Sequence, residues 1–238
     1  AERFPDLIAM REKNFGIWEE ITYKQYWEQA QWIGCALNYY GVETQDSVAI
    51  HSENRPEWFI SDVAIQAIGA VSVGLYPTNP PSEVSYLIGH SESKILFAED
   101  QEQVDKALEV IEELPELKKI IYFEPRGLTN YDSPLLITWE EFLQIGKEEF
   151  EKNPNLVTDK LELIEPEDIA IMVYTSGTTG RPKGVVLSNA NIIETAKTTC
   201  EFDNLKQSDE ILAYLPMAWI GDFIFSVGQA MWSGFCVN

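Results

Sequence analysis

Helical and strand-like patterns of apolar residues alternate along the first half of the chain. From Tyr23 to Tyr40 the apolar side chains recur at helical spacing, after a capping box of Thr22 and Gln25 and before Gly41. Short apolar runs beyond this helix predict strands at 47–52, 71–76, 94–98 and 119–123. The segments between them predict helices at 56–68, 81–87 and 103–113. This alternation is typical of βαβ units, so we predict an α/β fold built on a parallel sheet.

The pattern weakens between Lys147 and Asp168. This stretch is acidic, contains Pro154 and Pro166 and shows little periodicity, which predicts a long connection. We therefore predict two parts: residues 1–165, an α/β subdomain with its acidic connection, and residues 166–238, the start of a second α/β subdomain. In the second part the expected strands are 169–173, 185–187 and 210–215, and the expected helices are 191–200 and 223–231.

One loop combines glycines, hydroxyl side chains and positive charge. It reads Tyr174-Thr-Ser-Gly-Thr-Thr-Gly-Arg-Pro-Lys-Gly184. Glycine lets backbone N–H groups approach a ligand closely, and Ser and Thr hydroxyls add donors. Only four Lys or Arg residues stand against ten Asp or Glu from residue 161 to 238, and two of the four are in this loop. Although such compositions are common in plain surface turns, this concentration of charge favours a phosphate site.

The loop differs from a Walker P-loop, which requires G-x-x-x-x-G-K-[ST] at the start of a helix. Here Pro182 stands five positions after Gly177, and Lys183 is followed by Gly184 rather than by Ser or Thr. The flanking segments are rich in β-branched residues, and Pro182 would remove a helical N–H. We therefore predict a phosphate-binding loop between two strands.

Residues 175–184 resemble the phosphate-binding signature of the AMP-forming adenylating superfamily, which includes acyl-CoA synthetases, luciferases and nonribosomal peptide adenylation domains. Two further segments, 67–80 and 215–221, resemble family segments in the same order. The run Arg55-Pro-Glu-Trp58 and an aromatic-rich N-terminal region are most similar to long-chain fatty acyl-CoA synthetases; the residues of that region are Tyr23, Tyr26 and Trp27. An aryl acid stays open as the substrate.

The resemblance implies the layered α/β subdomains of an incomplete large N-terminal domain, and it implies a function. A carboxylic acid, here a long-chain fatty acid, would be activated by ATP to an acyl-adenylate and then transferred to CoA. Thr175 would help to coordinate Mg²⁺, and Lys183, the candidate catalytic residue, would place its charge on the triphosphate. Trp219 stands where many relatives carry His or another aromatic residue, and it would line or gate the acyl site. The residues implied to hold ATP are Thr175, Ser176, Gly177, Thr178, Thr179, Gly180 and Lys183.

Composition narrows the class of partner. The formal charge of −22 and the pI near 4.3 argue against nucleic-acid binding, which needs a basic face. Cys35, Cys200 and Cys236 are odd in number and far apart, which favours buried thiols in a reducing compartment. Without a signal pattern or a long apolar stretch, we predict a cytoplasmic location. The resemblance allows a peripheral membrane contact of the parent protein and leaves the oligomeric state open.

Several functional groups of the family have no counterpart before Asn238. The missing groups are a Glu that binds Mg²⁺, an Asp that holds the ribose and a catalytic Lys on a C-terminal domain. We therefore expect the chain to be an N-terminal fragment of a longer ligase that is inactive alone. The alternative is a non-catalytic nucleotide-binding or interaction module. His51 is expected to be structural, and Asp62 and Asp222 receive no role.

Overall fold

A seven-stranded sheet forms the centre of the computed structural model, which describes residues 3–175 and 180–238. Its order is β7-β6-β5-β3-β4-β8-β9, and within the described residues every neighbouring pair is parallel except β8 with β9. The bounds are β3 Ser47–His51, β4 Val71–Leu75, β5 Ile95–Ala98, β6 Lys119–Tyr122, β7 Leu136–Thr138, β8 Ile169–Thr175 and β9 Lys183–Ser188. The predicted α/β fold with a parallel sheet is confirmed.

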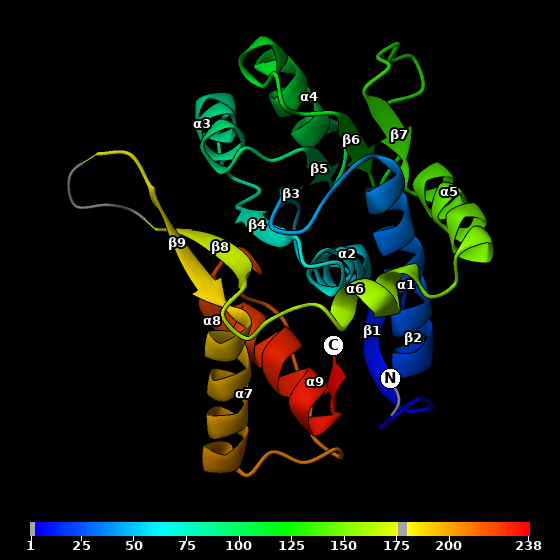
Figure 1. The fold of residues 1–238 in the computed structure, drawn as a ribbon, viewed down its shortest axis with the longest axis vertical. Helices are drawn as coiled ribbons and strands as arrows, with labels where there is room; N and C mark the ends of the chain where they lie inside the picture. Colours follow the sequence, from blue (N-terminus) through cyan, green and yellow to red (C-terminus); the bar gives the residue numbers. More distant parts are fainter. Residues whose placement is uncertain (1–2, 176–179) are drawn as a thin grey trace.

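Helices cover both faces of this sheet (Figure 1). On one face, Val48 and Ile50 of β3 pack in a core shared with α1 (Tyr23–Tyr39), α2 (Pro56–Ala67), α5 (Trp139–Lys152) and α6 (Leu156–Leu161). On the other face, Ala49 packs in a second core shared with α3 (Pro81–Ser91) and α4 (Gln101–Glu109). Successive strand residues point to opposite faces. The apolar runs of the sequence are therefore unbroken because both faces are buried.

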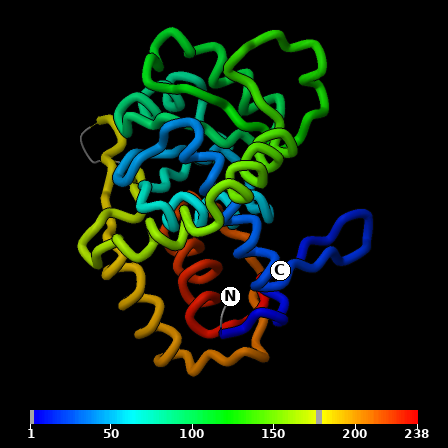
Figure 2. The backbone as a smooth tube through the Cα atoms, turned by 45° about the vertical axis from the view of Figure 1, so that its right-hand side comes forward, coloured from blue at the N-terminus to red at the C-terminus, as the bar shows by residue number. Residues whose placement is uncertain are grey.

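A smaller sheet joins the two ends of the described chain. Its order is β10-β11-β1-β2, and its strands are β1 Ile8–Asn14, β2 Ile17–Thr22, β10 Glu210–Ile211 and β11 Cys236–Val237. β1 and β2 form an antiparallel hairpin that projects from the body of the molecule (Figure 2). Each of the two sheets contains strands from both sides of residue 165. The division into residues 1–165 and 166–238 stays a prediction.

The predicted long connection at 147–168 is wrong over most of its length. The end of α5 and all of α6 lie within it. α5 begins with a capping box of Thr138 and Glu141, and it buries Trp139 and Phe142. Because its exposed face is densely acidic, the stretch after residue 146 looked like a solvated linker. The helix is held by packing along one face, whose apolar residues recur at helical spacing but lie mostly before residue 147.

Other element boundaries also differ from the prediction. The β1–β2 hairpin and β7 were not expected, and the strand expected at 210–215 is limited to Glu210–Ile211. The helix expected at 223–231 is divided into α8 (Ile220–Phe223), a π-helical turn (Ile224–Gly228) and α9 (Gln229–Ser233). The helix expected at 103–113 ends at Glu109 and is followed by a 3₁₀ turn at Ile111–Glu113. The helix expected at 191–200 is α7, Asn189–Asp203.

Asp62 is an acidic side chain inside the core, only 1% exposed on α2. Burial raises its pKa from the usual 3.8 to about 7, while a hydrogen bond donated by Gln66 Nε2 to Oδ2 at 2.7 Å opposes the shift. The folded state therefore favours the protonated carboxyl. This contribution to stability is fully present below about pH 4 and is lost as the pH rises to about 7.

We expect the substitution Asp62→Asn to stabilise the protein near neutral pH. The amide keeps an acceptor for Gln66 and never ionises. Relative to wild type, the free energy of unfolding is expected to rise by on the order of 4 kcal/mol between pH 4 and pH 7 and then to level off. Urea unfolding across this range measures the difference. Asp159→Asn on α6, an exposed position, is the control; equal pH profiles for the two variants would contradict the account.

Candidate functional site

The glycine-rich loop lies between two strands, as predicted, and these strands are antiparallel. β8 ends at Thr175 and β9 begins at Lys183, and these two residues face each other in the strand register. Both are exposed, as are Gly180 and Arg181. The predicted ligand residues Ser176, Gly177, Thr178 and Thr179 lie outside the described residues. The strand pair therefore places a hydroxyl and an ammonium group side by side at the base of the loop.

Helix α3 supports the outgoing side of the loop. Tyr86 Oη donates a hydrogen bond to the Pro182 carbonyl oxygen at 2.9 Å. The Arg181 guanidinium carbon lies 5.1 Å from the centre of the Tyr86 ring, a cation–π distance. Over residues 3–175 and 180–238, no Asp or Glu forms an ion pair with Arg181 or Lys183. Within that range the positive charge of the loop is not neutralised by the chain and is available to an anionic ligand.

A second contact fixes the end of β8. Tyr174 Oη lies 2.7 Å from His90 Nδ1, and the rings of Tyr86, His90 and Tyr174 pack with centroids 5.3 to 6.4 Å apart. Burial raises the pKa of the Tyr174 phenol to about 12, so it stays neutral at physiological pH. Sequence reasoning missed Tyr86 and His90. Their spacing of four marks one face of a helix, but nothing local relates that face to a loop so far along the chain.

The segment that carries Trp219 packs against the centre of the large sheet. A Cβ atom at Gly74 of β4 would lie only 2.9 Å from Ala218 Cα, so the segment crosses the strand in close backbone contact. Met217 and Ala218 line a small cavity together with Val173, which is two residues before Thr175. Trp219 itself is 43% exposed and is the residue immediately before α8. The segment that carries Trp219 therefore packs on β4, and the glycine-rich loop extends from the neighbouring strand, β8.

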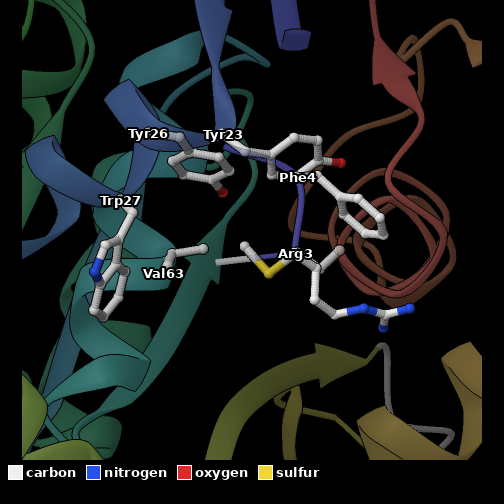
Figure 3. Close-up of a pocket in the computed structure, with 7 residues that line it drawn as sticks. Arg3, Phe4, Tyr23, Tyr26, Trp27 and Val63 are labelled. Atoms are coloured by element: carbon white, nitrogen blue, oxygen red, sulfur yellow. The ribbon is translucent and has the colours of Figure 1, made fainter. Parts of the chain in front are cut away.

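Two adjoining cavities lie among the helices beside this segment. The larger, about 540 Å³, is bordered by α7 and α9 and includes Ile192, Phe223 and Val227 in its lining. The smaller, about 350 Å³, is lined by Tyr23 and Tyr26 (Figure 3). Both share three lining residues, Trp27, Val63 and Met231. Phe223 also lines the small cavity beside β8. Mainly apolar walls are thus shared between neighbouring cavities, and they include the aromatic residues singled out in the sequence.

The remaining predictions concern metal, thiols and membrane. Among the described residues, no group of three or more His, Cys, Asp or Glu is arranged to hold a metal ion. Thr175 offers one hard oxygen ligand, which suits Mg²⁺ bound mainly through phosphate and water. Cys35, Cys200 and Cys236 are free and buried, as expected. No helix within 3–175 and 180–238 has the length and apolar character to span a membrane.

Comparison with known proteins gives one consistent family. The family model described as AMP-binding enzyme matches residues 1–238. The long-chain-fatty-acid–CoA ligase ACSBG2 of Xenopus laevis is 33% identical over 234 residues, covering 96% of this chain and 31% of that protein. The long-chain-fatty-acid–CoA ligase ACSBG1 of Homo sapiens is 31% identical over 240 residues, covering 98% of this chain and 32% of that protein. The chain thus spans about a third of the length of these curated relatives.

Solved structures agree on the fold. The crystal structure of the anthranilate CoA ligase AuaEII, in complex with anthranoyl-AMP, superposes with a TM-score of 0.79 at 23% identity. The match covers 99% of this chain and 42% of that one. At this level of identity the likeness concerns the fold alone. Both sheets described above therefore belong to an architecture that is known in longer chains.

Proposed function

This chain belongs to the AMP-binding enzyme family, and from that premise we propose that the protein containing it is an AMP-forming acyl-CoA ligase. In the first step a carboxylate oxygen attacks the α-phosphorus of ATP, and pyrophosphate leaves. In the second step the CoA thiol attacks the acyl carbon, and AMP leaves. The observation that carries the proposal is the β8–β9 loop, whose exposed Lys183 and Arg181 form no ion pair among the described residues.

The main physical obstacle in the first step is repulsion between two anions. A carboxylate must approach a triphosphate, so positive charge and donors have to be held in place before the reaction. Lys183 supplies a point charge at the start of β9, and Arg181 supplies a second cation against Tyr86. Thr175 contributes a hydroxyl opposite Lys183. A bound Mg²⁺ would neutralise part of the phosphate charge, with Thr175 as the candidate protein ligand.

A long apolar acid is the substrate class that fits best. Relatives with 31% to 33% identity are described as long-chain-fatty-acid–CoA ligases. The two adjoining cavities of about 540 and 350 Å³ provide mainly apolar walls of the kind that a long acyl chain needs. Trp219, exposed beside the sheet, is our candidate for lining the entrance on the carboxylate side.

Carboxylate-dependent exchange of labelled pyrophosphate into ATP by the full-length protein tests this function. We expect exchange with long-chain fatty acids and less with short or aryl acids. Exchange fastest with an aryl acid would preserve adenylation but overturn the fatty-acid assignment. Absence of exchange with every acid would reject the ligase and favour a non-catalytic nucleotide-binding module. Residues 1–238 alone are expected to give no acyl-CoA.

A further inference from the structure

Asn54 binds a distant segment through every polar atom of its side chain. Its Nδ2 donates to the carbonyl oxygens of Ala213 and Leu215 at 3.1 and 2.7 Å and to Asp222 Oδ2 at 3.1 Å. Its Oδ1 accepts from the Met217 backbone N–H at 3.0 Å. The partners are about 160 residues away in the sequence.

The position of Asn54 explains why it can reach this segment. It follows β3 and precedes α2, at the carboxyl end of a central parallel strand. Ligands of open α/β sheets bind along this edge. The segment from 213 to 222 crosses the neighbouring strand at Gly74 and carries Trp219 between two of the residues that Asn54 binds. Asn54 therefore holds the chain on both sides of the candidate acyl residue.

An asparagine side chain can form this set of hydrogen bonds, whereas an aspartate side chain cannot. The segment offers carbonyl acceptors and an N–H donor within reach of one side chain. An amide has donors and an acceptor at opposite ends, whereas a carboxylate accepts only. A carboxylate at this position would also face Asp222, which is 2% exposed. Removal of the amide would leave several backbone groups of the segment without this hydrogen-bond partner.

We propose that Asn54 is a positioning residue that sets the location of the Trp219 segment and thereby the binding of the carboxylic acid. This inference rests on the proposed ligase function and adds Asn54 to the residues predicted from the sequence. Asn54 acts on the acid through Trp219, and in the described part of the chain its side-chain hydrogen bonds go to residues 213–222. Loss of the Asn54 side chain should therefore weaken the binding of the acid more than the binding of ATP.

The first test separates these two effects in the full-length protein. For Asn54→Ala we expect the KM for the fatty acid to rise about tenfold while the KM for ATP stays within about twofold. In a Trp219→Ala background the same substitution is expected to change the acid KM by less than about twofold, because both act on one element. Asn155→Ala, at an exposed position, is the control. Equal rises in both KM values, or additive effects of the two substitutions, would overturn the proposal.

A second measurement does not depend on catalysis. Hydrogen–deuterium exchange of the full-length wild type and Asn54→Ala proteins reports on the backbone of residues 213–222. We expect faster exchange in this segment and unchanged exchange in β3 and β8. Unchanged exchange at 213–222 would refute the role of Asn54, whatever the enzyme does. Residues 213–222 could exchange slowly in the wild type and faster in Asn54→Ala while the wild type gives no pyrophosphate exchange with any acid. The ligase function, and with it the effect of Asn54 on acid binding, would then be rejected. The role of Asn54 in holding the segment by hydrogen bonds would stand.

Discussion

Lys183→Ala in the full-length protein is expected to reduce carboxylate-dependent pyrophosphate exchange by about 100-fold, the usual cost of one lost transition-state contact. The ammonium group lies at the start of β9, opposite Thr175, and no Asp or Glu among the described residues forms an ion pair with it. Because negative charge builds up on the leaving pyrophosphate, loss of this cation should lower kcat as well as raise the KM for ATP.

Lys206→Ala is the matched control for this experiment. It removes the same charge from an exposed position between α7 and β10. Surface substitutions of this kind change free energies little, so we expect exchange within about twofold of wild type. Similar activities for the two variants would show that net charge, rather than the place of Lys183, determines the rate. The triphosphate role of Lys183 would then be wrong.

Gly146→Ala is expected to destabilise the fold where α5 packs against α1. Gly146 lies on the face of α5 that packs against α1, where an added Cβ would overlap the Trp32 carbonyl oxygen and lie 2.6 Å from the carbonyl carbon. Backbone atoms cannot move aside as a flexible side chain can, so the two helices must separate. We expect the overlap to lower the free energy of unfolding by about 3 kcal/mol. Alanine offsets roughly 1 kcal/mol of this loss through its higher helix propensity.

Gly89→Ala provides the comparison, since Gly89 is also inside a helix. A Cβ at Gly89 would meet only the Leu114 side chain, at 3.8 Å. The propensity gain is then unopposed, and we expect a neutral effect or stabilisation of up to about 1 kcal/mol. Thermal or urea unfolding of both variants measures the difference. If the two substitutions changed stability equally, the close α1–α5 contact would not exist as described.

The sequence predicted the parts of the fold in which local pattern and burial agree. The βαβ alternation of residues 47–123 identified the parallel sheet, since these strands are buried on both faces and bounded by turns. It failed for α5 and α6, where acidic exposed residues hide a short packed face. It also failed at β1 and β2, whose side chains are largely exposed and whose sheet is completed by residues more than 190 positions later.

In the candidate site, too, the sequence predicted the local features and missed the long-range contacts. Glycine, hydroxyl and cation patterns in residues 175–184 are local, and they predicted the loop and its strand flanks correctly. The residues that hold the site in place are not local. Tyr86 reaches Pro182 across 96 positions, and Asn54 reaches Met217 across 163 positions. No periodicity of a single chain encodes such a contact, because it depends on how the sheet brings its edges together.

The transfer of oxygen from the carboxylate tests the central claim most directly. The full-length protein would be given ATP, CoA and a long-chain fatty acid labelled with ¹⁸O in its carboxylate, and the nucleotide product would be analysed by mass spectrometry. We predict AMP that has gained one ¹⁸O atom, together with acyl-CoA, because the carboxylate oxygen that attacks the α-phosphorus leaves with it. Formation of ADP, or of AMP without the label, would contradict adenylation at the β8–β9 loop.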